Sequence, residues 1–427
     1  MGNSNTSFGK FLFLWSGELV SAIGSGLTSF GLAVYVFRLT GSATLMAMLT
    51  LLAFVPALLL SPAAGVLADR YDRRILMILG DSLSALGLIF ILGCMLLGNV
   101  QLWQIYVGVT ISSIFSSLLE PAYKATVSDL LTKEQYSKAS GLVQIAGSSK
   151  FLISPILAGF LLSIWDIKLL LIIDICTFFF TVSVTSIVRK GLVSNASENR
   201  DSFIGEFKEG WKVIHGNRGI FILVLLTSVI TFFLGFIQIL STPMILAFSN
   251  TATLGTIETI CASGMLVSSI LIGVFSIRGG YVNILSVSLF CTGIFMALFG
   301  LRENVFLICT AGFLFFATLP FANTSIDVLI RKNLENSVQG RAWGLIGVIS
   351  QLGYVVAFAL AGILADYLFT PMLLPGGLLA SSIGKLTGTG EGRGIGLLIL
   401  VSGFFVLLTS LLLARSPAVK RLENANV

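Results

Sequence analysis

Residues 65–74 read GVLADRYDRR and place five charged side chains within the six positions from Asp69 to Arg74. Long apolar stretches lie on both sides of this segment. A charged side chain costs about 2.5–3.5 kcal/mol at the centre of a bilayer, so a cluster of five is too costly to bury in lipid. The segment therefore predicts a tight aqueous turn between two membrane-spanning helices.

The composition of the whole chain indicates a membrane protein. Hydrophobic residues make up 56% of the 427 residues and charged residues 11%, and the mean hydropathy is +0.97. Soluble proteins carry about 25% charged residues. Twelve apolar segments reach the roughly 20 residues that a helix needs to cross the hydrocarbon core, and the alternation typical of a β-barrel is absent from the sequence. The segments are 11–36, 44–64, 76–98, 102–126, 139–163, 168–188, 219–247, 254–276, 282–300, 304–330, 342–369 and 394–414. The predicted fold class is an all-α membrane protein with twelve transmembrane helices.

The positions of the basic residues predict the orientation of the chain. With twelve spans, both termini lie on one face, and that face carries 20 of the 26 Lys and Arg residues, against five on the other. Loops rich in Lys and Arg remain in the cytoplasm, so both termini are expected there. This asymmetry accounts for the net charge of +6, which gives no reason to expect nucleic acid as a partner. The apolar stretch from Phe11 to Phe37 lacks a small-residue cleavage site, so it predicts the first span and not a signal peptide.

Motifs for metal, nucleotide or covalent chemistry are absent from the sequence. The five Cys residues are scattered singly and His215 is the only histidine, so neither a zinc cluster nor a Ser-His-Asp triad can be assembled. The chain also lacks the G-x-x-x-x-G-K-[ST] phosphate loop. We therefore expect no enzymatic activity, no cofactor and no bound metal, and the composition favours secondary transport over ATP-driven pumping.

A polar interval divides the chain into two halves. Residues 190–217 separate a predicted six-helix bundle at 1–189 from a second bundle at 218–427. Within this linker, residues 203–215 (FIGEFKEGWKVIH) place apolar side chains at helical spacing, which predicts an amphipathic helix on the membrane surface.

Internal similarity supports an arrangement of six plus six helices. An offset of 203 aligns Lys138 with Arg341 and several small residues of the fifth span with the eleventh, and an offset of 208 aligns Gly65 with Gly273. Two nearly equal offsets in the expected order predict two pseudo-symmetric six-helix bundles around a central cavity.

The turn at 65–74 resembles the loop between spans 2 and 3 of the major facilitator superfamily of secondary transporters, where the pattern is G-x-L-x-D-R-x-x-R-[KR]. Four further segments resemble the drug-exporter branch close to the macrolide-efflux proteins, namely TGSA at 40–43, SIWD at 163–166, FKEGW at 207–211 and GR at 340–341. The resemblance implies that the turn acts as a conformational switch, carried by Gly65, Asp69, Arg70, Arg73 and Arg74. Asp69 is expected to meet the cytoplasmic end of span 11, and the arginines to hold acids such as Asp129 and Glu134.

The fifth span carries SPILAG at 154–159, a degraded form of the GPxxGG element seen in antiporters of this superfamily. Pro155 and Gly159 permit a bend and close helix packing there. Two interpretations remain open, an antiporter marker and an ordinary packing kink.

Charged residues inside the predicted spans are the candidates for proton or substrate coupling. The arginine that many such antiporters carry in span 4 is absent, and the first half instead holds Glu18, Glu120 and Lys150. Their burial cost predicts that they face a cavity and pair with one another. The alternative is a structural ion pair between spans 4 and 5. Weaker candidates lie in other spans. Asp81 is expected to interact with the basic turn, the resemblance implies a peripheral position for Asp174, and Asp327 is expected to form an i,i+4 pair with Arg331, so all three are interpreted as structural. Glu258 and Asp366 lie towards the outer ends of their helices.

These features predict a monomeric transporter of the cell membrane that exports a small amphipathic or hydrophobic compound, such as a drug or a macrolide-like natural product. Proton antiport with alternating access is the expected mechanism, with the substrate, protons and the bilayer as partners. The alternatives are a lipid or lysolipid flippase, a nutrient facilitator, and a receptor or scaffold that does not transport. The outer loop at 370–394 is either a flexible segment that rests partly on the membrane or a re-entrant or lid segment over the exit.

Overall fold

The structure, a computed structural model, describes residues 2–98, 100–132, 135–189, 211–212, 214–275, 279–334 and 339–424. These residues form helices and connecting turns without strands. They contain twelve helical segments that are long and apolar enough to cross a membrane. The twelve predicted spans are therefore confirmed, and their ends agree to within about five residues.

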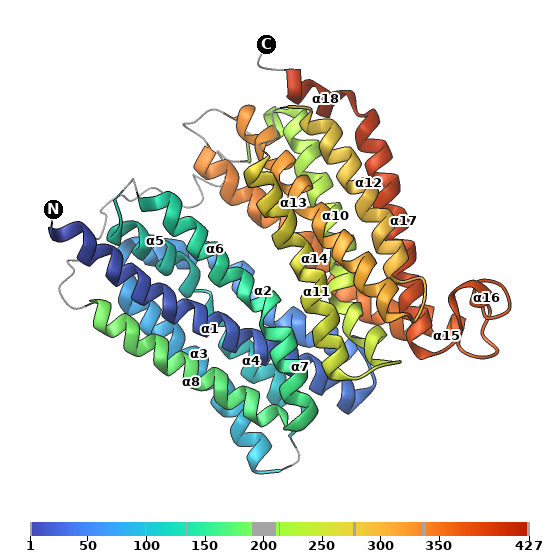
Figure 1. Cartoon of the computed structure of the whole chain (residues 1–427), viewed down its shortest axis with the longest axis horizontal. Coiled ribbons are helices and arrows are strands. Elements are labelled where there is room, and N and C mark those ends of the chain that lie inside the picture. Colours follow the sequence, from blue (N-terminus) through green and yellow to red (C-terminus); the bar gives the residue numbers. More distant parts are fainter. Residues whose placement is uncertain are drawn as a thin grey trace. The chain divides into compact units, whose positions relative to one another are not determined.

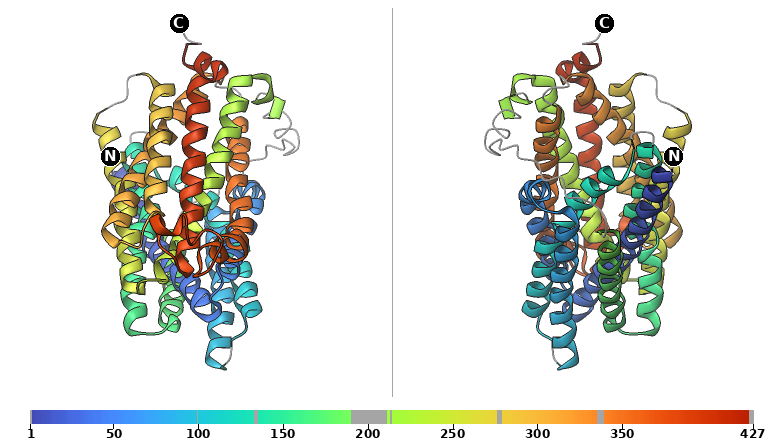
Figure 2. Two further views of the ribbon diagram at one scale, coloured as in Figure 1. Left: turned by 90° about the vertical axis from the view of Figure 1, so that its right-hand side faces the viewer. Right: turned by 90° about the vertical axis from the view of Figure 1, so that its left-hand side faces the viewer.

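The chain forms two compact units, residues 1–41 with 48–199, and residues 42–47 with 200–427. The helices of the first half are α1 (Gly2–Thr40), α2 (Ala43–Arg70), α3 (Arg73–Leu96), α4 (Leu102–Ser116), α5 (Leu119–Leu130), α6 (Tyr136–Leu152), α7 (Ser154–Ile164) and α8 (Ile167–Arg189) (Figure 1). Spans 4 and 5 are interrupted, so each consists of two helices. Figure 2 shows the α3–α4 connection at the end of the first unit remote from the N-terminus.

The second half continues the helical pattern. Its elements are α10 (Arg218–Leu246), α11 (Thr251–Val274), α12 (Tyr281–Phe299), α13 (Val305–Lys332), α14 (Gln339–Leu364), the π-helix η2 (Ala365–Phe369), α15 (Thr370–Leu373), α16 (Gly384–Thr387), α17 (Glu391–Arg415) and α18 (Pro417–Asn424). Most of the predicted amphipathic helix at 203–215 lies outside the described residues. Near its end, Trp211 stacks on His215 with ring centroids 6.1 Å apart.

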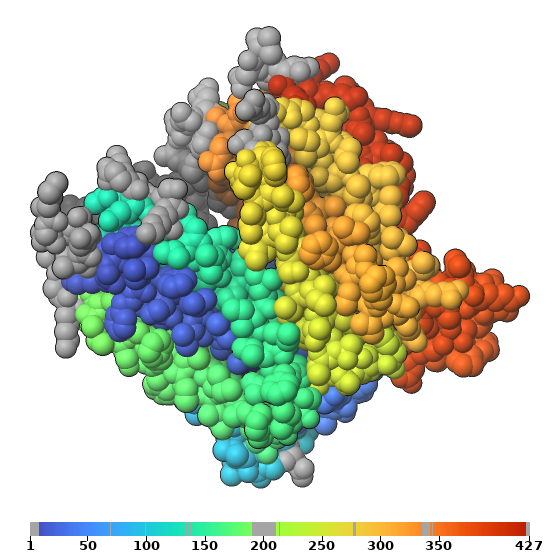
Figure 3. Space-filling model, viewed as in Figure 1, coloured from blue at the N-terminus to red at the C-terminus, as the bar shows by residue number. Residues whose placement is uncertain are grey.

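Glycines spaced by two helical turns bring α1 against α8 in the first unit. A Cβ atom added at Gly17 would lie 3.3 Å from Val184, and one at Gly31 would lie 2.6 Å from Ile167. Seven residues return to nearly the same side of a helix, so Gly24 lies on this face as well. Figure 3 shows α1 in blue beside α8 in green.

The side of α1 that faces away from α8 packs against the fifth span, at the point where that span is interrupted. Helix α6 ends at Leu152, and α7 begins at Ser154 with Pro155 in its first turn, so the predicted bend lies at this position. The Ser154 hydroxyl donates a hydrogen bond of 2.9 Å to the carbonyl of Ile23 on α1. Gly159 is buried further along α7. Because Pro155 lacks an N–H donor, it fits the first turn of a helix without loss of a hydrogen bond.

The predicted outer loop contains two short helices, and its role as a re-entrant or lid segment stays a prediction. Residues 370–390 contain the short helices α15 and α16, with Leu373 and Thr387 buried. The guanidinium of Arg393, 1% exposed, donates hydrogen bonds of 2.8 Å to the carbonyls of Gly300 and Leu301. Arg302 in turn donates to the carbonyl of Leu386 at 2.9 Å. These bonds fix the segment to α17 and to the α12–α13 connection.

Candidate functional site

The charged turn consists of only two residues, Tyr71 and Asp72, because α2 continues to Arg70 and α3 begins at Arg73. The Asp72 carboxylate caps α3 by accepting a hydrogen bond of 3.0 Å from the backbone N–H of Arg74. It also forms an ion pair of 3.2 Å with Arg189 at the end of α8. The predicted turn is present, although the helix before it is longer than the sequence indicated.

The two arginines after the turn share one carboxylate on α5. Arg73 lies 2.6 Å from Asp129, and Arg74, with its side chain 2% exposed, lies 3.4 Å from the same group. Arg73 also donates to the carbonyls of Ala68 and Ala125, at 3.2 and 3.3 Å. The predicted pairing of this turn with Asp129 is confirmed, and it ties α2, α3 and α5 together.

The remaining residues of the turn contribute less in this structure. Arg70 is exposed, and Gly65 lies within α2 with no atom within 4 Å of an added Cβ. The side chains of Asp69, Glu134 and Arg341 lie outside the described residues. The role of the turn as a conformational switch therefore stays a prediction.

Four charged side chains belong to the interior of the first unit. Asp81 on α3 and Asp174 on α8 are 1% and 2% exposed, and Glu18 on α1 and Lys150 on α6 are half-buried. Asp81 interacts electrostatically with both Glu18 and Asp174. Lys150 interacts electrostatically with Asp174. The structure thus links three carboxyl groups and one ammonium group across four helices.

Polar donors on two helices surround the Asp174 carboxylate. Ser25 on α1 and Thr177 on α8 donate hydrogen bonds of 3.4 and 3.3 Å to it. The peripheral position predicted for Asp174 differs from the structure, which buries this side chain in the first unit, where it interacts electrostatically with Lys150. The predicted contact of Asp81 with the basic turn also differs, because Asp81 interacts electrostatically with Glu18 and Asp174. The sequence offered one signal for the electrostatic interaction of Lys150 with Asp174, namely opposite charges on consecutive spans.

Glu120 occupies a different environment from the one expected. It forms an i,i+4 ion pair of 2.6 Å with Lys124, and its side chain is 76% exposed. It interacts electrostatically with Glu18, a group of the same sign. Glu120 pairs with Lys124 and not with Lys150, so the structure does not form the predicted cluster of Glu18, Glu120 and Lys150.

The acids of the second unit have separate partners. Asp327 pairs with Arg331 at 3.2 Å, the i,i+4 contact predicted from the sequence. Glu258 accepts a hydrogen bond of 3.4 Å from Thr242. Asp366 lies in the π-helix. It accepts hydrogen bonds from the Ser42 hydroxyl at 2.7 Å and from the Thr44 N–H at 2.9 Å. Residues 42–47, at the start of α2, belong to this second unit. Among the described residues no group of three or more His, Cys, Asp or Glu side chains could hold a metal ion.

The contact of α1 with Asp174 gives a first prediction. A Cβ atom at Gly24 would lie 2.8 Å from the Asp174 carboxylate and would also contact Thr177. Gly24→Ala should therefore push α1 from α8 and lower both transport and the thermal unfolding temperature in detergent. Gly9→Ala on the same helix, where no atom lies within 4 Å, is the matched control and should leave both unchanged. Equal behaviour of the two variants would contradict this packing.

Comparisons with known proteins agree with a transporter fold. The sequence profile of the Major Facilitator Superfamily matches residues 14–252. Macrolide efflux protein A of Streptococcus pyogenes is 28% identical over 365 residues, which cover 84% of this chain and 89% of the relative. The uncharacterized MFS-type transporter YfiS of Bacillus subtilis is 24% identical over 391 residues, covering 88% and 92%. The crystal structure of the nucleoside transporter NupG superposes with a TM-score of 0.75 at 14% identity, covering 95% of this chain and 98% of that one.

Twelve helices long and apolar enough to cross a membrane, together with the family match, identify a multi-pass membrane transporter. The chain belongs to the major facilitator superfamily.

Proposed function

We propose that this transporter exports a small amphipathic or hydrophobic compound from the cell by proton antiport. The substrate class rests on the relatives named macrolide efflux protein A, in Streptococcus pyogenes and Enterococcus faecalis. The positive-inside rule places the loops rich in Lys and Arg in the cytoplasm, so both termini lie on the cytoplasmic side of the plasma membrane.

The observation that carries the coupling proposal is the charge balance inside the first unit. Glu18, Asp81 and Asp174 are linked electrostatically, and Lys150 is the cation that interacts with this set among the described residues. Because an uncompensated charge in a span is costly, the surplus carboxyl groups need a bound proton or a cationic substrate. A group that binds either one, but not both, couples the movement of the proton to that of the substrate.

Glu18 and Lys150 keep the coupling role expected from the sequence, and we add Asp174 as the partner of Lys150 and Asp81 as the link to Glu18. The broken fifth span places Lys150 one turn before the α6–α7 break at Ile153. A change in the bend at Pro155 would therefore move Lys150 relative to Asp174. This gives a physical route by which a conformational change alters the affinity of the site for a proton.

The proposed function is tested by uptake into inverted membrane vesicles from cells that produce the protein. Macrolides and other hydrophobic cations are offered with and without an acidic interior. We expect uptake of at least one compound only when the gradient is present. Uptake that survives collapse of the gradient would contradict antiport and indicate a facilitator, and movement of labelled lipid in place of drug would indicate a flippase.

A further inference from the structure

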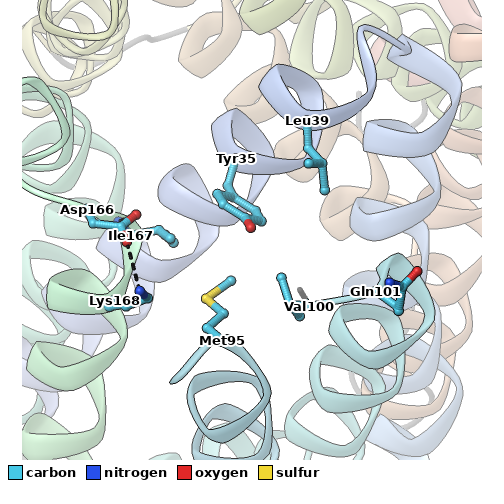
Figure 4. Close-up of a pocket in the computed structure, with 8 residues that line it drawn as sticks. All are labelled: Tyr35, Leu39, Met95, Val100, Gln101, Asp166, Ile167 and Lys168. Carbon is cyan, nitrogen blue, oxygen red and sulfur yellow. Dashed lines mark hydrogen bonds and ion pairs between the residues drawn. The ribbon is translucent and has the colours of Figure 1, made fainter. Parts of the chain in front are cut away.

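A cavity of about 380 Å³ lies at the end of the first unit, away from the DRYDRR turn. It is bounded by the end of α1, the α3–α4 connection and the start of α8 (Figure 4). Its volume falls at the lower end of the range for small-ligand sites. None of its residues takes part in the charge cluster of the preceding sections.

The polar wall of the cavity carries one charge of each sign. Asp166 and Lys168 form an ion pair of 3.5 Å, with side chains 59% and 40% exposed. The other Asp166 oxygen accepts a hydrogen bond of 2.7 Å from the Ile167 N–H. Figure 4 shows the Tyr35 ring and hydroxyl directed into the space between this pair and Gln101. Partly exposed ion pairs contribute little to stability, so their charges remain available to a ligand.

The rest of the wall is apolar, with Leu39, Met95 and Val100 as members. Two tryptophans next to the cavity in sequence, Trp103 and Trp165, are 59% and 55% exposed. Exposed tryptophans at the ends of transmembrane helices are enriched at the level of the lipid headgroups. This arrangement, with polar groups beside an apolar surface, is typical of a site at the membrane interface.

We propose that this cavity binds the headgroup of a zwitterionic phospholipid that carries a primary ammonium group, such as phosphatidylethanolamine. Lys168 contacts the phosphate, and the ammonium lies between the Asp166 carboxylate and the Tyr35 ring, where a cation is attracted by both. The acyl chains follow the apolar surface towards the membrane core. An anionic headgroup would leave Asp166 without a positive partner, and a simple cation would leave Lys168 without a negative one. The proposal rests on the membrane placement alone and does not depend on the transported substrate.

The test uses delipidated full-length protein titrated in detergent with phosphatidylethanolamine or phosphatidylglycerol and followed by native mass spectrometry. The wild-type protein should prefer phosphatidylethanolamine. Lys168→Gln should weaken binding of both lipids about fivefold, the effect of losing one partly exposed charge contact worth ~1 kcal/mol. Asp166→Asn should weaken phosphatidylethanolamine by a similar factor and leave phosphatidylglycerol unchanged. Asparagine can accept the same hydrogen bond from the Ile167 N–H at the start of α8, so this helix should remain folded.

Three controls keep the result decisive. Arg331→Gln removes one partner of an exposed ion pair in the second unit and should not alter lipid binding. Lys168→Arg, which keeps the positive charge, should retain binding if the glutamine variant fails to fold. Glycerophosphoethanolamine, which has the headgroup without acyl chains, should bind far more weakly than the lipid. Equal lipid preference in the wild-type protein and both charge variants, or equal binding of the chain-free compound, would overturn the proposal.

Discussion

Replacing Asp174 with asparagine should abolish gradient-driven export while the protein remains folded. Asparagine keeps the shape of the side chain and can still bond Ser25 and Thr177, which approach the carboxylate at 3.4 and 3.3 Å. It removes the negative charge that interacts electrostatically with Lys150, and with it one carboxyl group of the proposed coupling site. We expect the export rate in vesicles to fall at least about 100-fold, the lower end of the effect of removing a group that takes part in proton transfer.

Two further variants separate coupling from stability. Adding Lys150→Met to Asp174→Asn removes the stranded ammonium group, so it should restore thermal stability without restoring export. Glu120→Gln distinguishes the two assignments of the coupling site. The sequence alone predicts that it abolishes export, whereas its exposure and its ion pair with Lys124 predict a rate close to that of the wild-type protein. Normal export by Asp174→Asn with loss of export by Glu120→Gln would return the coupling role to Glu120.

The second large effect concerns the carboxylate that both arginines of the turn share. Asp129→Ala would leave the buried Arg74 guanidinium without its ion pair and would also remove the 2.6 Å contact of Arg73. Loss of one partner of a buried pair destabilises by about 3–5 kcal/mol. Because Asp129 is 29% exposed, we expect the lower end, about 3 kcal/mol, measured by thermal unfolding in detergent.

Asp327→Ala is the matched control for this second prediction. Its ion pair with Arg331 lies within one helix, α13, and both side chains are exposed, at 45% and 60%. Exposed i,i+4 pairs contribute about 0.3–0.5 kcal/mol. A stability loss of similar size in both variants would show that the Asp129 cluster does not hold α2, α3 and α5 together.

The spans and the turn could be predicted from the sequence because both follow from the cost of placing charge in lipid. Hydropathy distinguishes the segments that lie in lipid from those that lie in water. The five charges of the DRYDRR segment can reach water only in a turn outside the hydrocarbon core. The Asp129 pairing was also predictable, since the arginines of the turn require an acid at the same face of the membrane.

The rotation of each helix about its axis could not be predicted in the same way. Apolar residues surround most of these spans on all sides, so the 3.6-residue period does not show which face is buried. The apolar pattern could therefore have placed Lys150 near Glu120 or near Asp174. The same pattern does not show that α1 packs on α8 through the glycines at 17, 24 and 31. The hydrogen bonds from Ser42 and Thr44 to Asp366 join residues more than 300 positions apart, which no local pattern in one sequence indicates.

The most direct test of proton antiport is proton movement on addition of substrate. Purified protein is reconstituted into liposomes that contain a pH-sensitive dye, with no initial gradient, and a transported macrolide is added outside. The account predicts that protons leave the liposomes as the macrolide enters, and that Asp174→Asn shows no proton movement. Entry of the macrolide with an unchanged internal pH in the wild-type protein would contradict it.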